Sequence, residues 1–260
     1  MMQRREFVAG SAAALMSGVA GQASAAAEGR PMRQLLELRH YALASNAKRE
    51  LLEKFFAEAA IPAWNRIGIQ PVGVFRSMEA EDFGLRVLLA HGSPLTVVTE
   101  STRLMEDAAY LEASKAILPD SFDDPAYQRI ESSLLLAFSA MPKVEVPTQA
   151  ASRVLQLRVY ESHNLAMHLK KVEMFEGGGE LEIFRRVGLN PVFLGRALIG
   201  PKLPNLTYML AFDDMDAQKA AWEAFQKDAQ WTELKARPEY ANTVSNITNI
   251  LLAPSPGSQI

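Results

Sequence analysis

The chain has 260 residues and a formal net charge of −3, which is too mild to indicate a nucleic-acid partner. It contains no cysteine, so disulfides, thiolate metal sites and cysteine nucleophiles are excluded. Apolar residues make up 48% of the sequence and charged residues 22%, a balance typical of a packed globular protein.

The first 27 residues have the layout of an export signal. Arg4 and Arg5 precede an apolar run over 8–20, and small residues follow over 23–27. The paired arginine resembles the twin-arginine type, and cleavage after Ala25 or Ala27 fits equally well. The apolar run is shorter than a membrane span requires, and no later stretch is apolar enough to cross a bilayer. We therefore expect a periplasmic or secreted protein; an amphipathic or uncleaved helix is the alternative.

The first half of the remaining chain, 33–141, predicts strand, helix, strand, strand, helix, strand. Alternation indicates a strand over 35–41, and Ser45 can cap the helix that follows, which Pro62 interrupts before Gly68. A hairpin is expected over 72–91, then a helical region over 94–116 and an apolar strand over 132–139.

The second half, 153–254, predicts the same order after a proline-containing linker at 142–152. Its strands are expected at about 153–160, 191–197, 206–212 and 243–253. Gly177–Gly179 interrupts its first helix, an amphipathic helix covers 214–226, and 255–260 is expected to be a tail.

The two halves also share sequence. Arg66-Ile-Gly-Ile-Gln-Pro-Val recurs as Arg186-Val-Gly-Leu-Asn-Pro-Val, and Tyr160 follows Tyr41 by 119 positions. A repeat of this length indicates two domain-sized units. Two strand-helix-strand motifs in each half predict α+β architecture, with two tandem ferredoxin-like βαββαβ repeats and antiparallel sheets. The apolar strands near Leu135 and Leu251 must be covered, so we expect the sheets to face each other as a pseudo-dimer around a barrel-like cavity.

These motifs resemble the NIPSNAP family. The resemblance rests on Glu-Leu-Arg-x-Tyr at 37–41, on the duplicated Arg-x-Gly-x-x-Pro-Val turn, and on a tryptophan-containing helix after the third strand. It covers 35–253 in two copies, although Tyr110 replaces the position of Trp231 and Gln156 replaces the acidic residue of the first motif. The resemblance implies the dimeric α/β-barrel fold and leaves the activity open.

Four residues are the sharpest ligand-binding candidates: Arg39, Tyr41, Arg158 and Tyr160. Alternation places each pair on one face of its strand, which we expect to face the cavity, where guanidinium and phenol groups can hold an anion or a carbonyl oxygen. The structural alternative is that the arginine pairs with Glu37 and the tyrosines only pack.

Glu37 is the candidate catalytic base, if it is desolvated. The histidines do not form a metal site, because His163 and His168 are five residues apart and His40 is expected to face the helices. We expect no metal, haem or other cofactor.

The leading hypothesis is an exported NIPSNAP-like protein that binds a small organic ligand or a protein partner through the cavity between the repeats. The alternative is a cofactor-independent oxygenase or isomerase, and a third hypothesis is a structural assembly module. Homo-oligomerisation stays open.

Overall fold

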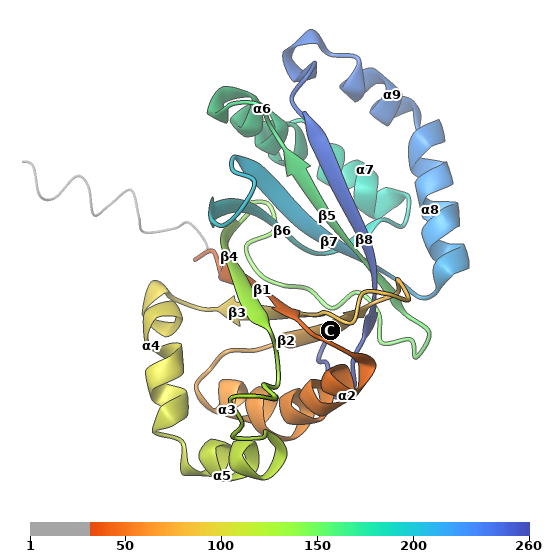
Figure 1. Cartoon of the computed structure of the whole chain (residues 1–260). Coiled ribbons are helices and arrows are strands. Elements are labelled where there is room, and N and C mark those ends of the chain that lie inside the picture. Colours follow the sequence, from red (N-terminus) through yellow and green to blue (C-terminus); the bar gives the residue numbers. More distant parts are fainter. Residues whose placement is uncertain (1–31) are drawn as a thin grey trace, which may run out of the picture. The chain divides into compact units, whose positions relative to one another are not determined.

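The computed structural model describes residues 32–260 (Figure 1). The predicted export signal at 1–27 lies outside the described residues. Arg33–Ile260 form one unit, which holds all the elements described below.

The first half has the predicted element order, with each helical region divided into shorter elements. Its elements are β1 (Leu35–Ala42), α2 (Asn46–Phe55), the π-helical turn η1 (Phe56–Ala60), α3 (Ile61–Arg66), β2 (Val72–Ser77), β3 (Leu85–His91), α4 (Pro94–Met105), α5 (Ala108–Ile117) and β4 (Arg129–Ala137). The irregular turn falls directly before Pro62, which lacks the backbone N–H that a regular helix requires.

The second half repeats this order. Its elements are β5 (Val154–Glu161), α6 (Leu165–Glu176), α7 (Glu180–Arg186), β6 (Asn190–Ile199), β7 (Asn205–Phe212), α8 (Met215–Lys227), α9 (Ala229–Lys235), the 3-10 turn η2 (Pro238–Tyr240) and β8 (Asn246–Pro254). The break between α6 and α7 lies at the predicted glycines, and Gly179 adopts the left-handed conformation with φ 97°.

Eight antiparallel strands within 32–260 close into one barrel in the order β1-β3-β2-β8-β5-β7-β6-β4. Two seams join the halves: β2 pairs with β8, and β4 pairs with β6. The helices lie outside the barrel, with α2–α5 against the first half and α6–α9 against the second (Figure 1). The sheets thus cover each other, as the apolar strands predicted.

The segment 255–260 is part of the fold, so the expectation of a tail is wrong. Backbone N–H groups of Ser255 and Gln259 donate to the carbonyls of Val74 and Val72, each at 2.9 Å. Ile260 is only 1% exposed and packs in the barrel interior. The segment therefore continues β8 along the edge of β2, a long-range pairing that its own short sequence does not indicate.

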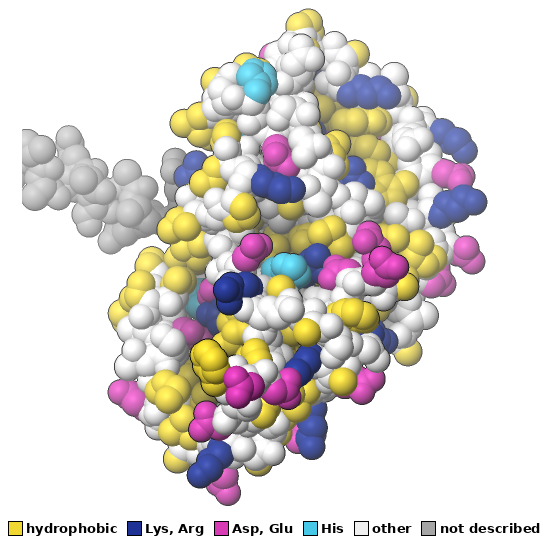
Figure 2. Space-filling view, viewed as in Figure 1, with side chains coloured by type: hydrophobic (Ala, Val, Ile, Leu, Met, Phe, Trp, Pro, Cys, Tyr) yellow, Lys and Arg dark blue, Asp and Glu magenta, His cyan; other side chains and the backbone are white. Residues whose placement is uncertain are grey.

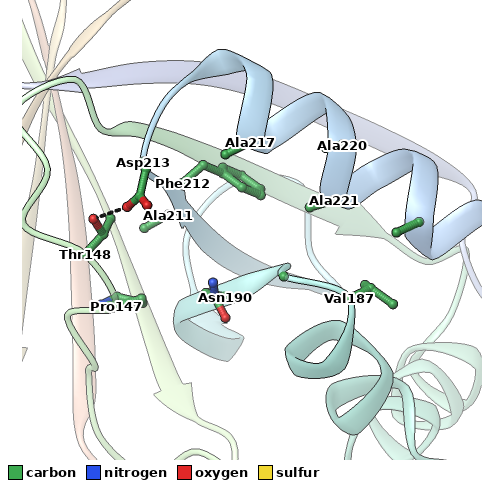
Figure 3. Close-up of a pocket in the computed structure, with 12 residues that line it drawn as sticks. Pro147, Thr148, Val187, Asn190, Ala211, Phe212, Asp213, Ala217, Ala220 and Ala221 are labelled. Atoms are coloured by element: carbon green, nitrogen blue, oxygen red, sulfur yellow. Dashed lines mark hydrogen bonds between the residues drawn. The ribbon is translucent and has the colours of Figure 1, made fainter.

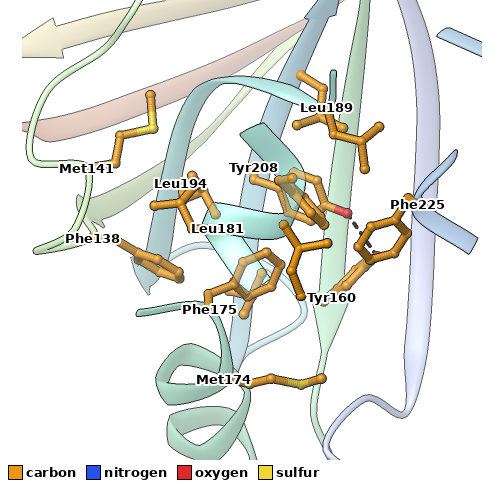
Figure 4. Packing of buried hydrophobic residues seen from close by; sticks show 14 of the residues in the cluster. Phe138, Met141, Tyr160, Met174, Phe175, Leu181, Leu189, Leu194, Tyr208 and Phe225 are labelled. Atoms are coloured by element: carbon orange, nitrogen blue, oxygen red, sulfur yellow. Dashed lines mark hydrogen bonds between the residues drawn. The ribbon is translucent and has the colours of Figure 1, made fainter. Parts of the chain in front are cut away.

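Three apolar clusters hold the molecule together. One fills the barrel, and one lies between sheet and helices in each half. Figure 4 shows the cluster of the second half, in which Phe175, Tyr208 and Phe225 pack among aliphatic side chains. A buried ion pair lies beside it, where Lys171 Nζ donates to Glu180 Oε2 at 2.6 Å.

None of the helices in 32–260 has the length and apolar content needed to cross a membrane. Acidic and basic side chains are intermingled on the face of the molecule that Figure 2 shows.

Candidate functional site

Glu37, Arg39 and Tyr41 face the helices of the first half, and our prediction that they face the cavity is wrong. The ring of Tyr41 packs edge-on against Phe56 at a centroid distance of 5.1 Å. Leu36, on the opposite face of β1, belongs to the cluster inside the barrel. Alternation separates the two faces of a strand, but it does not say which face is inward when both are covered.

Glu37 is the centre of a buried hydrogen-bond network. Arg39 donates to its carboxylate from Nε at 2.7 Å and from Nη2 at 3.0 Å. Ser132 donates at 2.7 Å, and His91 Nε2 lies 3.2 Å from Oε2. Burial alone would raise the pKa of Glu37, but its hydrogen bonds with His91 and Arg39 lower that pKa to about 2. A carboxylate with these partners is a weak base, so its contacts do not support the predicted catalytic role.

Arg39 has a second carboxylate partner on α4. Its Nη2 lies 3.2 Å from Oε2 of Glu100, and the indole of Trp64 donates to the other oxygen of Glu100 at 2.5 Å. Burial raises the pKa of Tyr41 to about 12, so its phenol stays neutral. The polar layer of the first half is therefore internally satisfied.

The corresponding layer of the second half has no carboxylate at its centre. Gln156 accepts a hydrogen bond from the Trp222 indole at 2.6 Å and donates to Asn249 at 2.7 Å. The Arg158 guanidinium lies 4.7 Å from the ring centroid of Trp222 and 5.4 Å from that of Tyr160. These contacts hold Arg158 by cation–π interactions instead of an ion pair.

The four predicted ligand-binding residues do not converge. Arg39 and Tyr41 lie beneath the helices of the first half, whereas Arg158 and Tyr160 lie beneath those of the second. The barrel wall separates both pairs from the interior. Our prediction of one shared cavity for all four residues is therefore wrong in its geometry, and whether either pair binds a ligand stays a prediction.

A different set of side chains meets at one end of the barrel interior. A pocket of about 290 Å³, here called the barrel-mouth pocket, opens there between the two halves. Its lining comprises Leu38, His40, Arg86, Glu131, Ser133, Leu157, Val159, Pro201, Lys202, Asn205, Thr207 and Ile250.

The barrel-mouth pocket is apolar on its inner side and polar at its rim. Leu157 belongs to the cluster that fills the barrel, and Leu38 and Ile250 pack against that cluster. The basic groups at the rim are balanced by acidic neighbours: Arg86 pairs with Asp82 at 3.2 Å, and Lys202 with Glu161 at 3.5 Å. The arrangement suits an uncharged molecule with an apolar body and a hydrogen-bonding group.

His40 lies at this pocket, so our prediction that it faces the helices is wrong. Its Nε2 is buried and has no hydrogen-bond partner among residues 32–260. A Cβ atom at position 84 would lie 2.6 Å from this nitrogen, so Gly84 makes room for the ring. Burial, followed by the charge of Arg86, lowers the pKa of His40, which keeps the imidazole neutral at physiological pH.

Sequence reasoning missed Arg86, Glu131 and Lys202. A usable signal was present, because Arg86 and Glu131 share a strand face with the interior residues Leu88 and Leu135. Charged residues at the ends of otherwise apolar strand faces indicate an end of the barrel that is open to solvent. Lys202 lies in a loop, where no periodicity exists to place it.

A second pocket of about 480 Å³ lies beside α8 (Figure 3). The alanines of α8, including Ala217 and Ala221, form one wall. Asp213 accepts a hydrogen bond from Thr148 of the inter-half segment, which ties that segment to the start of α8. The pocket brings few polar groups together and is the weaker ligand-site candidate.

The described part of the chain contains no group of three or more His, Asp or Glu residues arranged to hold a metal ion.

Comparisons with known proteins bear on the second half and on the fold. The NIPSNAP family model matches residues 155–259. No curated protein matches this chain in sequence. The resemblance of the first half to the same family stays a prediction.

Two solved structures share the fold over 86% of this chain at low identity. A protein from Fusobacterium nucleatum subsp. nucleatum, named as a candidate monooxygenase, is 8% identical with a TM-score of 0.57, over 86% of this chain and 93% of its own. A similarly named protein from Lactobacillus acidophilus is 10% identical with a TM-score of 0.57, over 86% of this chain and 94% of its own. A NIPSNAP-like domain protein from Burkholderia xenovorans is 17% identical with a TM-score of 0.37, over 40% of this chain and 86% of its own.

Identities of 8–10% show a common fold and nothing about activity. The chain has an α+β fold with a closed antiparallel barrel, and its residues 155–259 match the NIPSNAP family model.

Proposed function

We propose that this protein binds a small organic molecule in the barrel-mouth pocket. One observation carries the proposal: side chains from both halves enclose about 290 Å³ with an apolar inner side and a polar rim. Small-molecule sites commonly start at about 300 Å³ and combine an apolar lining with a few hydrogen-bonding groups. The pocket therefore suits a compact ligand.

The chemistry of the lining narrows the ligand class. The apolar body of the ligand would pack on Leu38, Leu157 and Ile250, and its polar group would meet Ser133 or His40. Because the rim cations already have acidic partners, a full negative charge on the ligand gains little there. We therefore propose an uncharged ligand that carries a hydroxyl, carbonyl or amide group.

Three further proposals accompany this one. The halves are two tandem ferredoxin-like copies, supported by their common element order and the duplicated turn. Export through a twin-arginine signal at 1–27 is supported by the sequence alone. Cofactor-independent oxygenase or isomerase activity remains the alternative, and a turnover assay with the identified ligand decides between binding and catalysis.

The test uses protein purified without denaturation from its own host. We expect the native mass spectrum to show a bound molecule that dissociates on activation. Val159→Trp places an indole in the barrel-mouth pocket and should remove that mass, whereas Ile130→Trp changes the outer face of β4, where Ile130 is 41% exposed, and should retain it. If Val159→Trp does not fold, Val159→Phe makes the same test with a smaller side chain.

Two results contradict the proposal. One is equal ligand content in the wild type and the folded Val159 variants. The other is wild-type protein that carries no organic molecule and takes none up from a small-molecule extract of its host.

A further inference from the structure

Arg158 lacks the ion pair that its counterpart makes. In the first half, Arg39 binds the carboxylate of Glu37 through two hydrogen bonds and also contacts Glu100. Among residues 32–260, no carboxylate lies within ion-pair distance of Arg158. A partly buried guanidinium without an anion is uncommon, because desolvating a charge is costly unless it is compensated.

Burial lowers the pKa of Arg158, but the phenols of Tyr208 and Tyr160 outweigh this effect and raise it, although no carboxylate is among its described neighbours. Gln156 is committed to Trp222 and Asn249. The hydrogen bond from Arg158 to Asn249 is long at 3.5 Å, and the buried Nε of Arg158 has no partner within the described chain. At least part of the donor fork of Arg158 is therefore available to a ligand.

The surface beside Arg158 is open and apolar. Asn249 is exposed and Ile247 is 46% exposed, and both lie on β8 directly opposite β5 residues that face the helices. Trp222 on α8 covers the other side of the guanidinium. Figure 2 shows hydrophobic side chains gathered in the hollow between β8 and α8. An apolar body can rest there while a charged group reaches Arg158.

We infer that this surface, here called the Arg158 site, binds the carboxylate of a small organic acid with an aromatic or aliphatic body. The first half shows which group complements this guanidinium, because Arg39 is paired there with the carboxylate of Glu37. Asn249 can donate from its amide once the ligand arrives, and the body of the acid would pack on Trp222 and Ile247. A carboxylate fits better than a phosphate because two coplanar oxygens match the two donors that Arg39 uses.

The Arg158 site is separate from the barrel-mouth pocket. Val159 lines that pocket, whereas Arg158, its neighbour on β5, lies on the outer face of the barrel. The two sites also differ in chemistry, since the barrel-mouth pocket has balanced charges and the Arg158 site has an unbalanced cation. Each proposal can therefore fail without the other.

Calorimetric titration of the purified full chain tests the inference with three probes: 2-naphthoate, its uncharged analogue 2-naphthamide, and inorganic phosphate. We expect 2-naphthoate to bind at least tenfold more tightly than either of the others. Arg158→Gln should weaken naphthoate binding at least tenfold, about what a charge-assisted pair contributes. Gln156→Glu should weaken it equally, because it supplies the internal carboxylate that the first half already has.

Two controls accompany these variants. Arg76→Gln removes an exposed arginine, and Val159→Trp fills the barrel-mouth pocket; both should leave naphthoate affinity within about twofold of wild type. If Arg158→Gln fails to fold, Gln156→Glu still gives the result. Equal affinity for naphthoate and naphthamide, or unchanged naphthoate affinity in folded Gln156→Glu, would overturn the inference. Loss of binding in Val159→Trp alone would place the probe in the barrel and overturn it as well.

Discussion

Replacing Glu37 with Gln should reveal how strongly the buried network stabilises the first half. Glu37 is 9% exposed, and its carboxylate accepts hydrogen bonds from Arg39 and Ser132. Glutamine keeps the shape but loses the charge, so Arg39 retains only Glu100 as an anionic partner. We expect a folded but less stable protein.

The magnitude follows from the pKa of Glu37, which is lowered from 4.5 to about 2. A lowered carboxyl pKa stabilises the folded state above the unfolded pKa, and this stabilisation is lost as the pH falls from about 4.5 through about 2. With this pKa shift, the ionised Glu37 contributes about 3 kcal/mol to the free energy of unfolding at pH 7 and about 1 kcal/mol at pH 3. Breaking a buried ion pair by removing one partner costs about 3–5 kcal/mol, which agrees with the first figure.

Urea denaturation of the wild type and Glu37→Gln at pH 7 and pH 3 measures both figures. Other carboxylates titrate equally in the two proteins, so the difference between them isolates Glu37. Glu112→Gln, at an exposed position on α5, is the matched control and should change the free energy of unfolding by less than about 0.5 kcal/mol. A Glu37→Gln effect below about 1 kcal/mol at pH 7, or one that is the same at both pH values, would refute this reasoning.

Three other predictions concern the rest of the fold. Lys171→Met should lower the free energy of unfolding, measured with urea, by about 3–5 kcal/mol, since it leaves the buried Glu180 without its cation. Adding Glu180→Leu should recover most of this loss, and a double variant no more stable than the single one contradicts the prediction. An NMR titration of His40 should give a midpoint below pH 6.5, and this midpoint should rise in Arg86→Gln because the charge of Arg86 contributes to the lowered pKa. An unchanged midpoint in Arg86→Gln would exclude Arg86 as a cause of the lowered pKa. Deleting residues 258–260 should lower the free energy of unfolding by at least about 2 kcal/mol, chiefly because the burial of Ile260 is lost. Thermal or urea denaturation measures this loss, and an unchanged stability would show that the segment does not pack against the barrel.

Much of the architecture could be predicted from the sequence, because the signals that specify it are local. Gly68 and Gly188 have φ of 83° and 87°, the left-handed conformation that the duplicated turn requires after each helix. Apolar runs such as 134–138 indicated strands buried on both faces, and the closed barrel supplies that burial. Segment 255–260 was mistaken for a tail because its partner, β2, is remote in sequence.

The site was harder to predict because strand orientation is a tertiary property. Glu37, Arg39 and Tyr41 do share one face of β1, as alternation indicated, yet that face lies under the helices. Both faces of β1 are covered and carry apolar side chains, so the pattern does not distinguish inside from outside. The barrel-mouth pocket depends on residues brought together across the seams from opposite halves, a proximity that no local pattern encodes.

The position of the bound molecule tests ligand binding at the barrel mouth most directly. Crystals of protein isolated from its own host, with its ligand retained, should show electron density for an organic molecule in contact with Leu38 and Val159. An empty barrel-mouth pocket in a crystal whose dissolved protein still carries the ligand by mass spectrometry would contradict the proposed function.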